Sequence, residues 1–311
     1  EVKTPMRPLF YFVFLCLPAI IFSCQSPREG DQSSNELITE TGMEVNLRKR
    51  VKSESDTNTW KTVAYKEHWD PEKTAIIVTD MWDRHWCESA TKRVAALAPA
   101  MENTLKNARD KGVTIIHSPS GTMDFYKDAP QRKAAIETPY HGAPEDFPIN
   151  EWCYLDTDKE AALPIDDSDG GCDKPCADGE PCEEMTAWTR QIPEISIASE
   201  DFITDQGQEV YNILVEHNIE HIVVMGVHLN MCVLGRPFAI RQLANLNKNV
   251  VLMRDMTDTM YNPEMPPYVS HFEGTALVVE HVEKYWAPTM VSADFTGEAA
   301  FAFDENLVYD E

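Results

Sequence analysis

One stretch, residues 221–241, constrains the fold of this chain more than any other. It reads HIVVMGVHLNMCVLGRPFAIR. An apolar run closed by Gly226 is typical of a buried strand in a parallel sheet, and the apolar spacing over residues 233–246 predicts a helix. Cys232 then falls in the turn after the strand, where open α/β sheets bind their ligands. Unpaired N–H groups and the helix dipole at such a turn favour a thiolate. We therefore interpret Cys232 as a candidate nucleophile, with a buried structural cysteine as the alternative.

The first 23 residues have the organisation of a secretory signal peptide. Arg7 precedes an apolar run over residues 9–22, and a small residue stands before Cys24. The run is short for a membrane-spanning helix and contains a proline. The segment Ile-Phe-Ser-Cys resembles a lipobox, so we expect lipidation of Cys24. An ordinary signal peptide and an uncleaved anchor are the alternatives. The chain is thus predicted to be exported, either periplasmic or a lipoprotein that meets the membrane only through its lipid anchor.

The rest of the chain divides by composition. Residues 24–58 are predicted to be a polar tether with one strand at 44–51, and residues 293–311 an acidic tail. Between them, residues 59–292 alternate strands with helices. The predicted strands are 74–79, 113–116, 195–197, 222–225, 250–253 and 289–292, with an edge strand at 60–65, and the predicted helices are 91–111, 204–217, 233–246 and 272–285. This alternation predicts an α/β fold, a doubly wound sheet of six mostly parallel strands with helices on both faces.

A cysteine-rich insertion interrupts this domain at about residues 150–190. It contains the stretch DDSDGGCDKPCADGEPCEE. In an exported protein we expect at least one disulfide to staple this loop. Zinc is the alternative, although the spacing matches no standard zinc finger. The sequence leaves open how the remaining cysteines pair: Cys87, Cys153, Cys172, Cys176 and Cys182.

The charge of the chain restricts its partners. Lys and Arg number 27 against 52 Asp and Glu, so the net charge is 27 − 52 = −25. Such a surface repels phosphate backbones, which argues against a nucleic-acid partner. A small-molecule substrate, neutral or cationic, fits this charge better, and a homo-oligomer is compatible with it.

Asp80 is the second residue with candidate chemistry. It ends the predicted strand at residues 74–79. In a doubly wound sheet this strand and the one before Cys232 are neighbours at the switch point, so their carboxyl ends meet. A carboxylate beside a thiol can accept its proton. The alternative role for Asp80 is to cap the next turn.

Three segments resemble the isochorismatase-like (cysteine hydrolase) superfamily, which includes nicotinamidases. They read TAIIVTDMWDRHWC, GVHLNMCVLGRPFAIRQL and VVLMRDMTD. The resemblance covers residues 74–292 apart from the insertion. It implies an Asp–Lys–Cys triad that cleaves amides, or vinyl ethers in some branches, with Asp80 as proton acceptor and Cys232 as nucleophile. It also implies a cis peptide between Val227 and His228, and an oxyanion hole formed by the N–H groups of His228 and Cys232.

The chain departs from this family at the lysine. The family's lysine should follow the third strand, near residues 198–201, where this chain reads Ala-Ser-Glu-Asp. Without an ammonium the thiolate loses a stabilising charge. Arg190 and Arg236 are the candidate substitutes. Two hypotheses follow: a cysteine hydrolase acting on a small amide or related C–N bond, or a non-catalytic binding protein for small molecules on the same scaffold.

Several side chains after the first strands are expected to line the substrate pocket: Trp82, Asp83, His85, Trp86 and His117. His228 is either a further substrate contact or a plain turn residue. We expect no cofactor and no metal. A divalent metal on Asp83 and His85, with His117 or His141 as third ligand, is the alternative.

Overall fold

The computed structural model describes residues 42–56, 59–174, 180 and 182–304. The expected signal peptide, Cys24 and Cys176 lie outside these residues. Within them, no helix is both long and apolar enough to cross a membrane.

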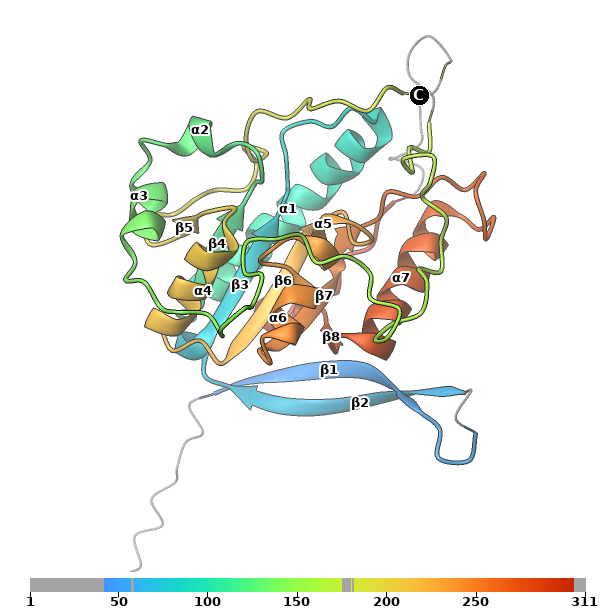
Figure 1. The fold of residues 1–311 in the computed structure, drawn as a ribbon, viewed down its shortest axis with the longest axis horizontal. Coiled ribbons are helices and arrows are strands. Elements are labelled where there is room, and N and C mark those ends of the chain that lie inside the picture. The colour runs from blue at the N-terminus through green and yellow to red at the C-terminus, as the bar shows by residue number, and fades with distance from the viewer. Residues whose placement is uncertain (1–41, 57–58, 175–179, 181, 305–311) are drawn as a thin grey trace, which may run out of the picture. The chain divides into compact units, whose positions relative to one another are not determined.

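A sheet of eight strands forms the centre of the fold, in the order β2-β1-β8-β7-β6-β3-β4-β5 (Figure 1). Six strands run parallel to one another, as predicted. They are β3 (Thr74–Thr79), β4 (Thr114–Ser118), β5 (Phe202–Ile203), β6 (His221–Val227), β7 (Asn249–Asp258) and β8 (Thr289–Met290). The prediction of an α/β sheet is confirmed, but the strand number of six is wrong.

The two additional strands form an antiparallel hairpin at one edge. β1 (Met43–Lys52) pairs along its whole length with β2 (Trp60–Trp69), and then antiparallel with β8. The strand predicted at 44–51 is thus confirmed as β1, but it is part of the sheet and not of a tether, so the folded domain begins well before residue 59.

Helices cover both faces of the sheet, as expected for a doubly wound fold. On one face, α1 (Glu88–Asp110) and α8 (Ala293–Thr296) share a core with the side chains of Ile76 and Val78. On the other, Ala75 and Ile77 pack among residues of α4 (Gly207–Glu216), α6 (Ile240–Asn245) and α7 (His271–Tyr285). Alternate residues of β3 thus supply both cores. The remaining short elements are η1 (Pro71–Lys73), α2 (Met123–Tyr126), α3 (Pro130–Glu137) and α5 (Cys232–Gly235).

Three predicted elements differ in the structure. The helix predicted at 233–246 is two helices, α5 and α6, because Pro237 lies between them and cannot donate a helical hydrogen bond. The strand predicted at 195–197 is wrong: the strand that pairs with β4 is β5, five residues later. The predicted acidic tail begins with α8, whose Phe295 is buried in the core.

Candidate active site

The carboxyl ends of β3 and β6 meet at the centre of the sheet. Thr79 pairs with Gly226, Asp80 follows β3, and Cys232 opens α5 after the turn that ends β6. Gly226 has φ +112, and a Cβ there would lie 2.0 Å from the carbonyl oxygen of Thr79. Only glycine permits this close approach of the two strands. The neighbouring positions predicted for Asp80 and Cys232 are those observed.

Asp80 is fully buried and held from several sides. Its Oδ1 accepts a hydrogen bond from the backbone N–H of Ser120 at 2.7 Å, and Arg236 Nε lies 3.2 Å from its Oδ2. Burial raises the pKa of Asp80, although Arg236, the Cys232 thiol and Ser120 each oppose that rise. The site thus holds a carboxyl group of increased basicity in contact with a thiol and a guanidinium.

Cys232 is a free cysteine that is 9% exposed. Its thiol interacts with Asp80 and Arg236. Burial, together with the Asp80 carboxylate, raises the pKa of this thiol far above its usual value, and Arg236 only partly opposes the rise. α5 has four residues, too few to supply much dipole. These influences favour a thiol that hydrogen bonds to the Asp80 carboxylate in the resting site, and not the thiolate that the turn was expected to favour.

Of the two candidate cations, the structure brings only Arg236 to the thiol. Arg236 follows α5, its side chain is 28% exposed, and its guanidinium lies 5.3 Å from the ring centre of Trp152. The guanidinium of Arg190 lies over the ring of Phe125 instead. At residues 198–201, where the lysine was expected, Asp201 is buried and binds Arg109 at 2.7 Å.

The turn between β6 and α5 contains the expected cis peptide between Val227 and His228. Leu229 N–H donates to the carbonyl of Asp258 at 2.7 Å, and the carbonyl of His228 accepts from Met231 and Val233. By contrast, within the described part of the chain, the N–H groups of His228 and Cys232 have no backbone acceptor. These two donors are available to a ligand oxygen, as an oxyanion hole requires.

Aromatic rings form one wall beside the turn. Trp82 stacks on Trp188 with 4.0 Å between ring centres, and His85 lies 4.8 Å from Trp86. His85 meets His228 edge-on at 5.1 Å. Burial, and to a smaller extent Arg93, lowers the pKa of His85 to about 4, and burial also lowers the pKa of His228. Both imidazoles are therefore neutral at pH 7.

His228 offers a further polar atom at this wall. Among the described residues its buried Nε2 has no hydrogen-bond partner. Nδ1 of His85 accepts from the backbone N–H of Cys87 at 3.1 Å, so Nε2 of His85 carries the proton.

Two predicted pocket residues lie in loop contacts instead. Asp83 accepts hydrogen bonds from Thr189 and Arg190. His117 is buried between Gln191 and Asp201. Asp83 and His117 therefore each position a loop. His141, the other candidate for the third metal ligand, forms a hydrogen bond with Glu216.

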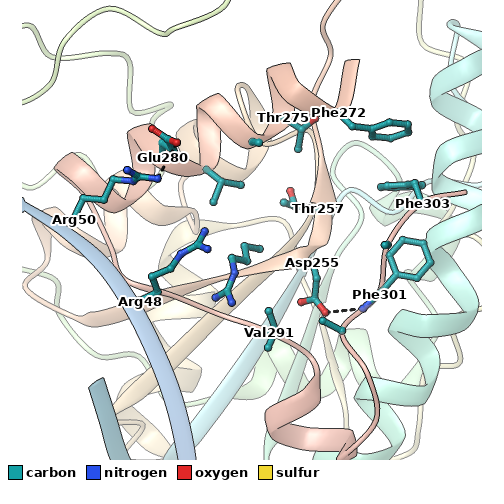
Figure 2. Close-up of a pocket in the computed structure, with 15 residues that line it drawn as sticks. Arg48, Arg50, Asp255, Thr257, Phe272, Thr275, Glu280, Val291, Phe301 and Phe303 are labelled. Carbon is teal, nitrogen blue, oxygen red and sulfur yellow. Dashed lines mark hydrogen bonds and ion pairs between the residues drawn. The ribbon is translucent and has the colours of Figure 1, made fainter. Parts of the chain in front are cut away.

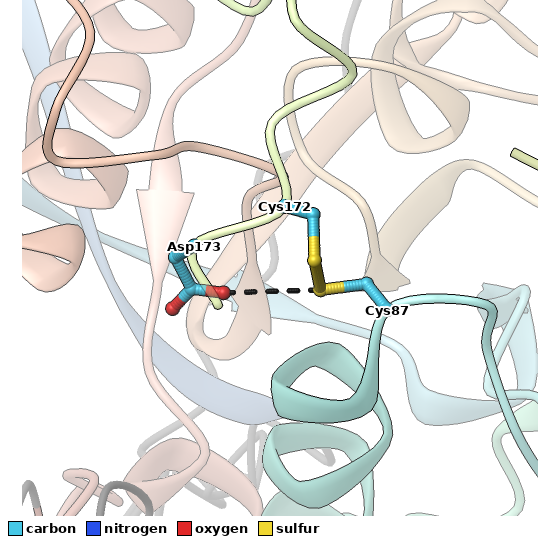
Figure 3. Close-up of side chains that lie close together, drawn as sticks. All are labelled: Cys87, Cys172 and Asp173. Atoms are coloured by element: carbon cyan, nitrogen blue, oxygen red, sulfur yellow. Dashed lines mark hydrogen bonds between the residues drawn. A yellow bond between two sulfur atoms is a disulfide. The ribbon is translucent and has the colours of Figure 1, made fainter. Parts of the chain in front are cut away.

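The potential metal ligands that come together in the described residues are a different set. They are Cys87, Cys172 and Asp173, whose ligand atoms lie within 4.8 Å of one another (Figure 3). Cys87 and Cys172 are joined in a disulfide, so their sulfur atoms are not thiolate ligands. The expectation of a disulfide that staples the insertion is confirmed, with Cys87 as the partner outside the loop.

Beside this disulfide, buried ion pairs connect the insertion to the turn between β6 and α5. Asp173, next to Cys172, lies 2.6 Å from Arg93, which in turn lies 2.6 Å from Asp258. The backbone carbonyl of Asp258 holds Leu229 in the turn. The insertion is therefore an integral support of the candidate site.

The sequence did not single out two residues of the site, Trp152 and Trp188. Both belong to the insertion, and each contacts a predicted residue, Arg236 and Trp82 respectively. Their only signal is the presence of tryptophan in an otherwise polar loop.

The family model of the isochorismatase domain matches residues 74–265, more than half of the chain. The chain belongs to the isochorismatase domain family. Its members are hydrolases, and the matched residues include Asp80, Arg236 and Cys232.

Solved structures of this family are similar to the chain at low identity. A cysteine hydrolase from Pseudomonas syringae pv. phaseolicola 1448A is 17% identical over 74% of this chain and 94% of its own, with a TM-score of 0.43. An isochorismatase from Pseudomonas putida KT2440 is 10% identical over 73% and 91%, with a TM-score of 0.43. An N-carbamoylsarcosine amidase from Thermoplasma acidophilum is 12% identical over 71% and 96%, with a TM-score of 0.36. No curated protein sequence matches the chain.

Proposed function

We propose that this member of the family is a cysteine hydrolase that cleaves a small amide or a related C–N bond. One observation carries the proposal: Asp80 contacts both the Cys232 thiol and Arg236, beside a turn with two free N–H donors. A nucleophile, a base and an oxyanion hole within one turn are the parts that acyl transfer requires.

In the first step Cys232 Sγ attacks the carbonyl carbon and its proton moves to Asp80. The C–O double bond becomes a C–O⁻ single bond, which the N–H groups of His228 and Cys232 stabilise by about 3 kcal/mol per donor. Asp80 then gives the proton to the leaving nitrogen as the C–N bond breaks. The products of this half-reaction are an amine or ammonia and a thioester on Cys232.

Water completes the cycle. Asp80, again a carboxylate, takes a proton from water as its oxygen attacks the thioester carbon. The C–S bond then breaks, and the proton returns from Asp80 to Cys232. The increased basicity of Asp80 suits it to both steps, because a base is most effective when its pKa lies close to the working pH.

In this proposal Arg236 supplies the positive charge that the family's lysine would supply. A guanidinium does not release its proton at working pH, so Arg236 balances charge and transfers no proton. The mechanism needs no cofactor. The neutral imidazoles and stacked tryptophans of the wall favour an uncharged substrate.

We also propose that the protein is exported and held at the membrane by a lipid on Cys24. The support is the Cys87–Cys172 disulfide, since disulfides persist mainly in oxidising compartments.

The proposed activity is tested by release of ammonia from a panel of small primary amides and ureas. Cys232→Ala should lower turnover at least about a thousandfold, because no acyl-enzyme can form. Cys153→Ala is the matched control, since Cys153 is the other free cysteine in the described residues and lies in the insertion. Full turnover by Cys232→Ala would refute the mechanism. Amides that bind the native protein without turnover would favour the non-catalytic hypothesis.

A further inference from the structure

A cavity of about 700 Å³ lies apart from the thiol site, among β1, β7, α7 and the segment after α8 (Figure 2). Its lining does not include Asp80, Cys232 or Arg236. The proposed hydrolysis makes no use of it. Its volume is within the range of natural small-molecule sites.

The two ends of this cavity differ in character. Arg48 and Arg50 from β1 lie at one end, and the rings of Phe272, Phe301 and Phe303 lie at the other (Figure 2). Phe303 stacks on Phe272 with 4.9 Å between ring centres and meets Phe301 edge-on at 5.0 Å. The cavity is therefore basic at one end and aromatic at the other.

Two of the arginines that line the cavity already have carboxylate partners. Arg48 Nε lies 2.6 Å from Glu283. Arg50 lies 2.8 Å from Glu280 and 3.2 Å from Glu283. Two carboxylates thus balance the charge of these two guanidiniums.

Arg254, from β7, is the third arginine of the lining and has no such partner. Its one hydrogen bond to a described residue runs from Nη1 to Thr289 Oγ1 at 3.2 Å, and it forms no salt bridge with these residues. A guanidinium carries five N–H donors in a fixed plane. Burial, and then the charge of Arg48, lowers the pKa of Arg254, and the more distant carboxylates of Glu283, Asp255 and Asp294 oppose this change only in part.

The acidic side chains of the lining form no direct ion pair with Arg254 and are bound elsewhere. The Asp255 carboxylate accepts hydrogen bonds from the N–H and hydroxyl of Ser292 and from the N–H of Phe301. Glu280 is paired with Arg50. An incoming anion at Arg254 would therefore displace no existing ion pair of Arg254.

We propose that this cavity binds a small amphipathic monocarboxylate, with its carboxylate on Arg254 and its apolar body against Phe272, Phe301 and Phe303. A carboxylate matches the planar fork of a guanidinium in two parallel hydrogen bonds. The aromatic end accepts the apolar body by burying its surface. The site is separate from Cys232, so binding does not depend on turnover.

Titration calorimetry with octanoate tests this site, and octanamide serves as the uncharged ligand of the same shape. Octanoate should bind saturably at millimolar concentration or below, at least about tenfold more tightly than octanamide. Arg254→Met should remove this preference, since methionine keeps the bulk of the stem and loses the charge. Arg190→Met is the matched control and should leave both affinities unchanged, because Arg190 lies over Phe125 outside the cavity.

A second variant keeps the test decisive if Arg254→Met does not fold, as judged by its melting curve and circular dichroism. Phe303→Ala should weaken octanoate and octanamide by similar factors, because it removes the apolar end and leaves Arg254 in place. Absence of saturable octanoate binding, equal affinity for octanamide, or undiminished binding by both variants would overturn the proposal. The calorimetry measures binding and no turnover. A negative result would therefore refute this site without bearing on the proposed hydrolysis, which is tested by the turnover of Cys232→Ala.

Discussion

In the proposed hydrolysis, one negative charge changes position at the thiol site while the guanidinium of Arg236 stays in place. In the resting site the charge is on Asp80, and after proton transfer it is on Cys232 and then on the substrate oxygen. Arg236 interacts with both Asp80 and Cys232. It therefore keeps a counter-ion throughout the reaction, and the transfer does not require a buried charge to be left unpaired.

Removing this cation should make Cys232 less reactive. Arg236 opposes the rise in the pKa of the Cys232 thiol. In Arg236→Met that pKa should rise further, so the rate of alkylation by iodoacetamide should fall at least about tenfold near pH 7 and its pH profile should shift upward. The rate is measured by mass spectrometry of the peptide that contains Cys232.

Two further variants define the outcome of this measurement. Arg236→Lys should retain more of the rate than Arg236→Met, because it keeps a positive charge. Arg190→Met should match the native protein, since Arg190 does not contact the thiol. If Arg236→Met reacts as fast as the native protein, Arg236 has no electrostatic role at Cys232.

The sequence predicted the neighbouring positions of Asp80 and Cys232 better than the position of the cation beside them. The neighbouring positions of Asp80 and Cys232 could be predicted because each residue follows a strand whose apolar pattern shows where the strand ends. The sequence could not tell whether Arg190 or Arg236 contacts Asp80, because that contact depends on the path of the chain after α5. The spacing of four residues between Cys232 and Arg236 was the one local signal, since it places both on one side of a helical turn.

Among the elements, the insertion between β4 and β5 is the part that sequence patterns describe least. It has neither helical nor strand periodicity over residues 150–190, and its position is set by side-chain contacts. Glu160 is one such contact. Its carboxylate binds Arg241 of α6 at 2.6 Å and His281 of α7 at 2.6 Å, and accepts from the indole of Trp286. Such partners are far apart in sequence, which is why periodicity could not predict them.

The Glu160 cluster should make stability depend on pH in the acid range. Burial alone would raise the pKa of Glu160, but hydrogen bonds from His281, Arg241 and Trp286 outweigh it and lower the pKa from 4.5 to about 2. A lowered folded-state pKa adds stability above pH 4.5 and loses it as the pH falls toward 2. The contribution at neutral pH is about 3 kcal/mol.

Urea unfolding of Glu160→Gln measures this contribution. The variant should be less stable than the native protein at pH 7, and the difference should shrink as the pH falls from 4.5 to 2. Asp158→Asn is the matched control, because Asp158 is exposed in the same loop. A difference between Glu160→Gln and native protein that stays constant over this pH range would contradict the assignment.

For the molecule as a whole, the main error of sequence reading lies at the edge of the sheet. Residues 42–52 are rich in charged side chains, and that composition placed them in a predicted tether, although a strand was predicted at 44–51. In the structure Met43, Val45 and Leu47 are buried while the residues between them are exposed. This alternation is typical of an antiparallel edge strand with one solvated face. The strand itself was predicted, but the polar composition of the surrounding residues concealed that it belongs to the sheet.

If β1 is an integral part of the sheet, truncating one of its buried side chains should lower the stability of the protein. Leu47 is 2% exposed and packs in the core shared with β8 and α8, whereas Lys49 on the same strand is exposed. Leu47→Ala should lower the free energy of unfolding by about 2–5 kcal/mol, because it leaves a cavity in that core. Lys49→Ala should change it by less than about 0.5 kcal/mol. Urea unfolding at neutral pH measures both, and a Leu47→Ala protein as stable as the native one would mean that the segment is a tether after all.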